Sequence, residues 1–224
     1  MYPDTTKERS FFSRVFFNMA WALVLTALTA YGVASYPPFA MAIVSNPTGL
    51  LLLMVFELIL VWTLSRRIMT MSVGAAYVGL VAFSLVNGVT LSLIFLVYTL
   101  ESIFLVFFAA AGLFLVTALF GYVTKKDLSA LGRFLYMSLF GFVIALVLNL
   151  FINSSPLMYI ISFAGVLIFA GITAYDMQYL KRMYETNDFS PDQVEKIALY
   201  GALKLYLDLI NLFLNLLRIF GRRR

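Results

Sequence analysis

Hydrophobic residues occur along this chain in long runs that polar residues interrupt only briefly. Six runs cover residues 15–34, 49–65, 72–98, 102–123, 134–152 and 157–180. Each has roughly the 20 residues that an α-helix needs to cross the hydrocarbon core of a bilayer. Strands of a membrane barrel would be shorter and would alternate apolar with polar residues. The pattern therefore predicts an all-α membrane protein.

A seventh run, Lys196–Phe220, follows a polar loop and has its own start signal. Ser190 is suited to cap a helix, Pro191 to fill its first position, and Gln193 to complete a capping box. The last helix is therefore expected to begin in water and to enter the membrane near Ile197. No internal repeat or linker separates the runs.

Polar residues interrupt the seventh run at regular intervals. They are Lys204, Asp208, Asn211, Asn215 and Arg218, spaced four, three, four and three residues apart. Because this spacing puts them on one face of a helix, they form a polar stripe. Lipid penalises such a stripe, so the last helix is expected to lie inside a bundle, with the stripe facing protein or water.

The composition agrees with a membrane protein. The 224 residues are 62% hydrophobic and 12% charged, with a mean hydropathy of +0.95, which a soluble domain of this length cannot bury. We expect a cytoplasmic tail over residues 1–14, one seven-helix transmembrane domain over 15–221 and a basic tail over 222–224.

The chain has no cysteine and no histidine, which excludes disulfides, thiol nucleophiles, serine–histidine triads and most zinc or haem sites. Any response to pH must then come from a carboxylate or a lysine.

Basic residues alternate between the two ends of the predicted spans. The amino terminus and the loops after spans two, four and six contain Lys7, Arg9, Arg14, Arg66, Arg67, Lys125, Lys126, Arg133, Lys181, Arg182 and Lys196, whereas the loops after spans one, three and five contain none. By the positive-inside rule, the amino terminus is cytoplasmic. The net charge of +5 therefore reflects topology rather than nucleic-acid binding.

The basic carboxyl terminus does not fit this alternation. If the seventh helix crosses the membrane, Arg218 and Arg222–Arg224 lie on the outer side. If the helix re-enters, they return to the cytoplasm. The charge favours re-entry and the apolar length favours crossing. We take crossing as the prediction.

Two acids at membrane depth are the candidate functional residues. Asp176 lies about one turn before the basic end of span six, and Asp208 lies near the middle of span seven. Since the two helices are consecutive and antiparallel, the carboxylates can approach each other. Two carboxylates in a low dielectric cannot both ionise cheaply, so we expect them to share a proton. Their oxygens also suit a transient contact with Ca²⁺.

Other polar side chains at membrane depth are candidates for secondary roles. The candidate counter-charges or latches are Lys204, Arg66 and Arg67, and the candidate polar-lining residues are Glu57, Asn211 and Asn215. Hydrogen bonding between helices is the more common role of such lining residues in a bundle. The two aspartates exceed what that bonding requires, so for them we favour the functional interpretation.

Three segments carry a family resemblance. They are Tyr122–Ser129 (YVTKKDLS), Gly171–Lys181 (GITAYDMQYLK) and Gly201–Gly221 (GALKLYLDLINLFLNLLRIFG). Together they resemble the Bax inhibitor-1 (TMBIM, YccA-like) family, and the size and span layout agree along nearly the whole chain. The resemblance implies a seven-helix fold whose last helix is central and is wrapped by two three-helix groups. It also implies a pH-sensitive Ca²⁺ leak that a hydrogen-bonded aspartate pair opens or closes, with Asp176 and Asp208 as that pair.

Two positions depart from the family pattern. The family's arginine in span two, which latches the pair, has no unambiguous counterpart here, and Arg66 and Arg67 are the nearest. Lys204 stands where relatives have serine or threonine. A lysine one turn from Asp208 would neutralise it, keep the site shut or repel Ca²⁺, and these alternatives stay open.

The favoured function is a proton-gated cation leak in a bacterial inner membrane, with Ca²⁺ as permeant ion, no cofactor and no enzymatic activity. An intramembrane aspartyl protease is one alternative, since Tyr175-Asp176 resembles the first motif of that class. Leu-Tyr-Leu precedes Asp208 instead of Gly-x-Gly, however, and the downstream Pro-Ala-Leu is absent. A retinal protein is disfavoured because Lys204 precedes the acid, whereas retinal proteins place the acid first.

A non-conducting regulator is the third class of function. Relatives in the family are associated with regulating a membrane protease and with suppressing cell death. A membrane protease or a stress-response protein is therefore a candidate partner besides the lipid bilayer. The segment Met1–Arg14 is the candidate contact for it. The sequence carries no signal for an oligomeric state.

Overall fold

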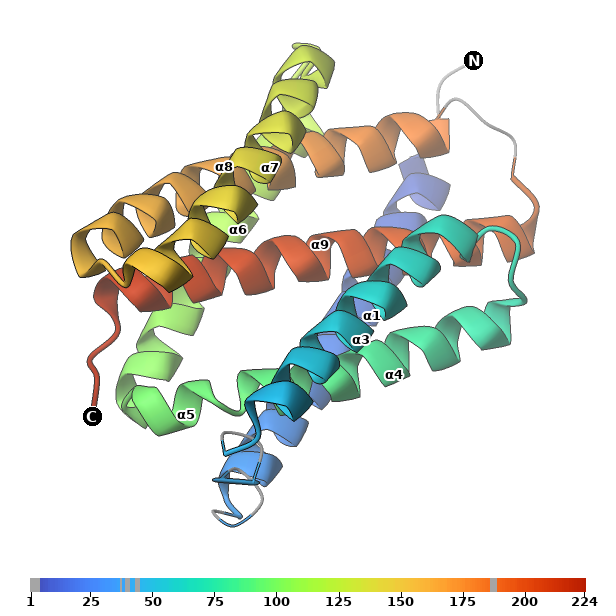
Figure 1. Cartoon of the computed structure of the whole chain (residues 1–224). Coiled ribbons are helices and arrows are strands. Elements are labelled where there is room, and N and C mark those ends of the chain that lie inside the picture. Colours follow the sequence, from blue (N-terminus) through green and yellow to red (C-terminus); the bar gives the residue numbers. More distant parts are fainter. Residues whose placement is uncertain (1–4, 37, 39–40, 43–44, 186–188) are drawn as a thin grey trace. The chain divides into compact units, whose positions relative to one another are not determined.

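The structure of the protein is a computed structural model that describes residues 5–36, 38, 41–42, 45–185 and 189–224. Within these ranges the chain is helical and contains no β-strand. The helices are α1 (Thr5–Ala34), α3 (Pro47–Arg67), α4 (Val73–Leu91), α5 (Ile94–Val97), α6 (Leu100–Val123), α7 (Ser129–Ile152), α8 (Ser155–Glu185) and α9 (Pro191–Phe220) (Figure 1). Seven segments are long and apolar enough to cross a membrane, α4 and α5 together forming the third. The predicted all-α fold with seven spans is confirmed.

Side-chain caps fix where several helices begin. Asn46, Ser72 and Thr99 each accept a hydrogen bond from the backbone N–H three residues later, at the starts of α3, α4 and α6. At the start of α9 the Ser190 N–H donates to Gln193 Oε1 at 2.9 Å. This is the reciprocal bond of the predicted capping box. The predicted start of the last helix is confirmed.

The first helix starts earlier than the hydrophobic pattern predicts. α1 begins at Thr5 rather than at Val15. Phe11 and Phe12 are buried, at 1% and 6% exposed, and the Phe11 ring stacks on Tyr184 with the centroids 4.5 Å apart. Part of the segment expected to be an exposed tail is therefore packed helix, while residues 1–4 lie outside the described residues.

The third span consists of two helices instead of one. α4 ends at Leu91 and α5 begins at Ile94. At the break the Ser92 hydroxyl donates to the Val89 carbonyl at 2.6 Å, a local bond that competes with the helical ladder. The end predicted for the first span agrees with the end of α1 at Ala34.

The contacts within the chain divide it into two units. Unit 1 comprises Met1–Tyr98, Tyr184–Tyr206 and Arg224, and unit 2 comprises Thr99–Met183 and Leu207–Arg223. Unit 1 thus contains α1, α3, α4 and α5, and unit 2 contains α6, α7 and α8. α9 contributes its first half to unit 1 and its second half to unit 2. Each unit therefore holds three spans, while the wrapping of two such groups around the last helix stays a prediction.

Among the described spans, α9 is the most buried. In the most apolar stretch of α9, 72% of the residues are buried, whereas 6% are buried in the corresponding stretch of α3. α9 is also an unbroken helix of 30 residues, about 45 Å long at 1.5 Å per residue. That length exceeds the hydrocarbon core of about 30 Å. A re-entrant segment would have to reverse direction inside the membrane, so the unbroken helix favours the predicted crossing.

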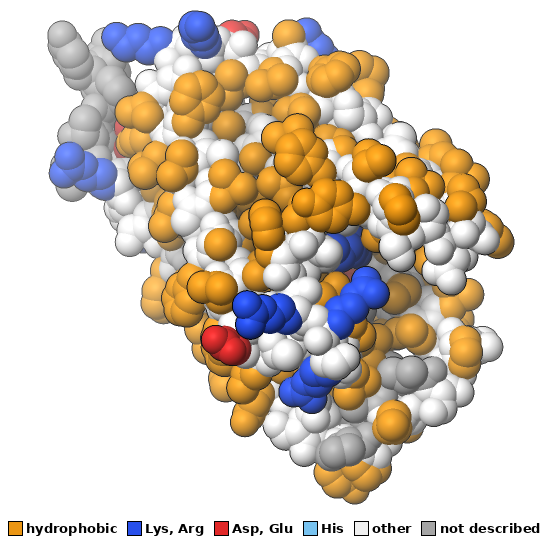
Figure 2. All heavy atoms as spheres, turned by 90° about the vertical axis from the view of Figure 1, so that its left-hand side faces the viewer, with side chains coloured by type: hydrophobic (Ala, Val, Ile, Leu, Met, Phe, Trp, Pro, Cys, Tyr) orange, Lys and Arg blue, Asp and Glu red, His pale blue; other side chains and the backbone are white. Residues whose placement is uncertain are grey.

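Hydrophobic side chains predominate on the outside of the molecule. Figure 2 shows hydrophobic side chains spread over the face that it draws, with basic side chains confined to a few places. Phe140, Leu150 and Phe151, for example, are 75%, 76% and 84% exposed. Exposed apolar area on this scale marks a surface that lipid covers. Together with the seven spans, it identifies a multi-pass integral membrane protein.

Candidate functional site

Asp176 lies on α8 and is buried in unit 2, with 1% of its surface exposed. The Tyr136 hydroxyl on α7 donates to the carboxylate and lies 2.9 Å from both Oδ1 and Oδ2. This bond across two helices fixes the orientation of the Asp176 carboxyl group. Sequence reasoning missed Tyr136, since no motif links it to an aspartate 40 positions later.

Tyr136→Phe is expected to lower the free energy of unfolding by about 1–2 kcal/mol, the loss typical of a hydrogen bond between membrane helices. Thermal unfolding of the purified protein in detergent measures it. Tyr159→Phe is the matched control, because Tyr159 is 53% exposed on α8 and should leave stability unchanged. Equal, small effects of the two substitutions would show that the Tyr136 bond does not stabilise the fold.

Small residues let the neighbouring helices approach α8 beside Asp176. A Cβ atom on Gly121 of α6 would overlap the Ala174 carbonyl, and one on Gly132 of α7 would overlap the Tyr175 ring. Close backbone approach at small residues is the usual way in which membrane helices pack. Here it brings α6 and α7 against the turn of α8 that contains Asp176.

Asp208 is the second buried acid of unit 2, 4% exposed on the second half of α9. One contact sets the register of α9 against α8: a Cβ atom on Gly165 would lie 2.5 Å from Asn215 Oδ1. The nearby Phe213 meets Phe107 of α6 edge to face, with the ring centroids 5.6 Å apart. Within unit 2, α8 and α9 run in opposite directions (Figure 1).

Helix geometry then relates the two acids. Asp176 follows Gly165 by eleven residues, and Asp208 precedes Asn215 by seven. These separations are about three and about two helical turns, so each acid shares the face of the residue that marks the contact. Along the helix axes, Asp176 lies about 16 Å from Gly165, and Asp208 lies about 10 Å from Asn215. Because α8 and α9 are antiparallel, both acids lie on the same side of the Gly165–Asn215 contact. Their positions along the two axes therefore differ by about one helical turn. This register is compatible with the predicted pair, with Asp208 the deeper member.

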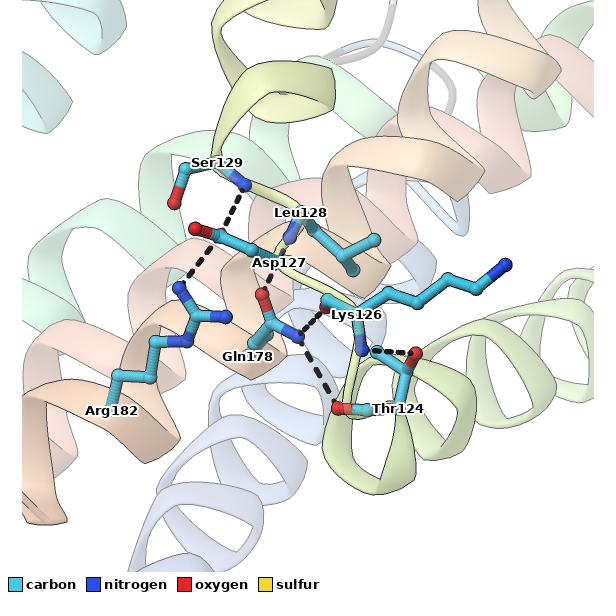
Figure 3. Close-up of polar contacts among 7 residues, drawn as sticks. All are labelled: Thr124, Lys126, Asp127, Leu128, Ser129, Gln178 and Arg182. Carbon is cyan, nitrogen blue, oxygen red and sulfur yellow. Dashed lines mark hydrogen bonds and ion pairs between the residues drawn. The ribbon is translucent and has the colours of Figure 1, made fainter.

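Gln178, two residues beyond Asp176, holds the loop between α6 and α7 (Figure 3). Its Oε1 accepts from the Leu128 N–H at 2.9 Å. Its Nε2 donates to the carbonyls of Lys126 at 2.8 Å and Thr124 at 3.4 Å. Gln178 is 5% exposed, so these bonds satisfy a buried amide. The loop is therefore fixed to the stretch of α8 that carries Asp176, a contact that sequence reasoning missed.

Asp127 in this loop is exposed and lies outside the membrane-spanning helices. Its carboxylate accepts from the Ser129 N–H at 2.9 Å and from the Arg182 guanidinium at 2.7 Å. The hydrogen bonds from Ser129, followed by that from Arg182, lower the pKa of Asp127 to about 2. The resulting stabilisation is complete above the ordinary pKa of 3.8 and is lost only as the pH falls through about 2. Near neutral pH, Asp127 therefore stays ionised and is not a pH sensor.

Unit 1 contains a separate polar network at membrane depth. Glu57 of α3 accepts from Asn87 Nδ2 and from the Thr90 hydroxyl (3.0 Å), both on α4. The Tyr206 hydroxyl of α9 donates to Asn87 Oδ1 at 2.8 Å and lies 2.7 Å from the Thr26 hydroxyl of α1. Glu57 thus makes the interhelical bonds that are common for such residues. Its partners were missed because each is a single polar residue in an apolar run.

The amides further along the polar stripe bond to their own helix. Asn211 Nδ2 donates to the Leu207 carbonyl and Asn215 Nδ2 to the Asn211 carbonyl, both at 2.8 Å. Arg218 donates to Asn215 Oδ1 at 3.4 Å. Bonding to a neighbouring helix, expected for these asparagines, is thus replaced by bonding to the preceding turn. Asn215 meets α8 by packing against Gly165 instead, and a polar lining stays a prediction.

Comparison with known proteins agrees with this layout. The family model described as "Inhibitor of apoptosis-promoting Bax1" matches residues 8–224. The chain belongs to the Bax inhibitor-1 family. The inner membrane protein YbhL of Escherichia coli K12 is 41% identical over 217 residues, which are 96% of this chain and 93% of that protein. An uncharacterized protein of Deinococcus radiodurans is 40% identical over 215 residues, which are 96% of this chain and 91% of that protein. An uncharacterized protein of Borreliella burgdorferi is 37% identical over 228 aligned positions, which cover 99% of this chain and 98% of that protein.

In this Bax inhibitor-1 family protein the candidate counter-charges belong to unit 1. The Lys204 ammonium lies 5.7 Å from the centroid of the Tyr200 ring, one turn earlier on α9. The Arg66 guanidinium lies 5.8 Å from the Trp62 ring, and both Arg66 and Arg67 are exposed at the end of α3. The aspartates belong to unit 2, so the latching role stays a prediction. Among the described residues, no group of three or more Asp, Glu, His or Cys side chains could hold a metal ion.

Proposed function

We propose that this Bax inhibitor-1 family protein is a pH-sensitive cation leak of the bacterial inner membrane, gated by Asp176 and Asp208 and permeable to Ca²⁺. The observation that carries the proposal is the burial of both acids in unit 2, at 1% and 4% exposed. They lie on the faces of α8 and α9 that meet at Gly165 and Asn215. The inner-membrane location follows the name of the E. coli relative, and the cytoplasmic amino terminus follows the basic loops.

Protonation of the pair acts as the switch in this proposal. Two ionised carboxylates about one turn apart in a low dielectric repel each other, so a shared proton stabilises the closed arrangement. Gain or loss of that proton changes the charge between α8 and α9 by one unit. A bundle with two arrangements then shifts toward the one that better accommodates the charge. Tyr136 keeps the Asp176 carboxylate oriented meanwhile.

The chemistry of the pair suits passage of a hard cation. Carboxylate oxygens are ligands that Ca²⁺ prefers, and conduction requires a contact weak enough for the ion to leave. Lys204 adds a positive charge one turn before Asp208 on α9 and is expected to reduce the flux. The proposal gives the pair no catalytic role, since Leu-Tyr-Leu precedes Asp208.

Ca²⁺ flux into proteoliposomes, measured against pH, tests the proposal. Asp208→Asn and Asp176→Asn are each expected to remove most of the change in flux between acid and neutral pH, because an asparagine exchanges no proton. Asp192→Asn is the matched control, since it makes the same change at an exposed position of α9. The control is expected to keep the pH profile of the native protein.

A pH profile that survives both pair substitutions would exclude the aspartates as the sensor. The native protein itself provides the second check. If its flux does not exceed that of protein-free vesicles at any pH, the leak is excluded, and the non-conducting regulator becomes the favoured function.

A further inference from the structure

Basic side chains gather at one end of unit 2, where the α6–α7 loop lies beside the end of α8. We call this the basic end; its members are Lys125 and Lys126 in the loop, Arg133 on α7, and Lys181 and Arg182 on α8. The acid of the loop, Asp127, is paired with Arg182 at 2.7 Å. The remaining charge of the basic end is therefore positive.

The loop presents its lysines outward from a fixed backbone. Gln178 bonds to the backbone of Thr124, Lys126 and Leu128, and the Lys126 N–H donates to Thr124 Oγ1 at 3.3 Å. Figure 3 shows the Lys126 side chain extending away from Gln178. Lys125 and Lys126 are both exposed, and neither forms an ion pair within the described part of the chain. Their charges are therefore available to a ligand from outside.

A tyrosine places Lys181 at the membrane surface. The Lys181 ammonium lies 4.4 Å from the centroid of the Tyr122 ring and donates to the Tyr122 carbonyl at 3.2 Å. Tyrosine is enriched at the membrane–water interface, where its ring lies at the level of the headgroups. Tyr122 is the penultimate residue of α6. The end of α6 therefore marks the headgroup depth.

Exposed apolar side chains adjoin the basic end. Leu119, Phe120 and Val123 in the last turns of α6 are 61%, 54% and 69% exposed, and Phe134 on α7 is 60% exposed. In a membrane-spanning bundle such side chains contact acyl chains. The lysines thus lie just beyond the end of the lipid-facing surface, at the depth of the lipid phosphates.

We propose that the basic end binds the phosphate group of anionic phospholipids. Lysine attracts phosphate as a compact point charge, and arginine binds it through paired N–H donors. A soluble anion would meet only these charges, whereas a phospholipid also places its acyl chains on the adjoining apolar surface. Each basic residue at an anionic membrane surface contributes about 1 kcal/mol, or about fivefold in binding. This site is independent of the proposed cation leak.

Lipid retention by the protein in bilayers of phosphatidylcholine and phosphatidylglycerol, measured by native mass spectrometry, tests this site. Lys125→Gln/Lys126→Gln is expected to lower the preference for phosphatidylglycerol by about fivefold for each lysine removed. Arg223→Gln/Arg224→Gln is the matched control, because it removes the same charge from two exposed residues at the carboxyl terminus. The control should keep the native preference, and thermal unfolding in detergent should show both variants folded.

Inorganic phosphate distinguishes the two sources of a phosphate group. Added in excess, it is expected to leave the bound phosphatidylglycerol in place because it has no acyl chains. Displacement of the lipid would indicate a site for a soluble anion and would overturn the assignment. An equal loss of preference in both variants would reduce the effect to net charge, and an unchanged preference in the lysine variant would also contradict the proposal.

Discussion

Gly121→Leu is expected to destabilise unit 2 by about 3 kcal/mol or more, at the upper end of what overpacking costs. A Cβ atom at this position already overlaps the Ala174 carbonyl, and a backbone carbonyl cannot rotate away as a flexible side chain can. The added side chain would force α6 and α8 apart beside Asp176. Gly121→Ala places the Cβ atom against the same backbone carbonyl and is expected to cost about 2 kcal/mol.

Thermal unfolding and size-exclusion chromatography in detergent measure this loss. Gly112→Leu is the matched control on the same helix, because a Cβ atom at Gly112 would meet nothing within 4 Å. It is expected to preserve stability or to raise it slightly, since leucine favours a helix more than glycine does. If the two leucine variants unfold at the same temperature, the close approach of α6 to α8 does not determine the stability of unit 2.

The number and placement of the spans could be predicted because crossing a bilayer requires about 20 apolar residues whatever the neighbouring helices are. The capping box before Pro191 is equally local, and it too was confirmed. The start of α1 was not predictable in this way. α1 extends ahead of the apolar run, and there Phe11 packs against Tyr184, a contact between residues far apart in the sequence.

The candidate site shows the same division between local and distant information. Asp176 and Asp208 stand out in the sequence because a charge inside an apolar run is costly and rare. Tyr136 and Gln178 do not stand out, since a single tyrosine or glutamine in a helix is ordinary. Only the fold brings α7 to Asp176 and the α6–α7 loop to Gln178. A costly residue can thus be recognised in the sequence, whereas its partner is found from the geometry.

Asn87→Leu is expected to lower the free energy of unfolding of unit 1 by about 3 kcal/mol. The substitution removes the amide that donates to Glu57 and accepts from Tyr206. Leaving a buried partner without its hydrogen bond costs about 1–3 kcal/mol, and more when that partner is charged. Thermal unfolding in detergent measures the loss. Thr70→Leu is the control, because Thr70 lies exposed after α3 and its hydroxyl makes a solvent-exposed bond to the Arg67 carbonyl at 2.9 Å.

A double-mutant cycle with Glu57→Leu separates the network from its single members. The Glu57–Asn87 bond is partly buried, and replacing both partners of such a bond by apolar groups is often nearly neutral, so Glu57→Leu/Asn87→Leu is expected to be more stable than Asn87→Leu alone. Strict additivity of the two single losses would mean that the residues do not interact energetically. Ca²⁺ flux through the double variant then decides the role of Glu57. Recovered stability with lost flux would assign Glu57 to the predicted polar path, and recovered stability with native flux would leave it an interhelical contact.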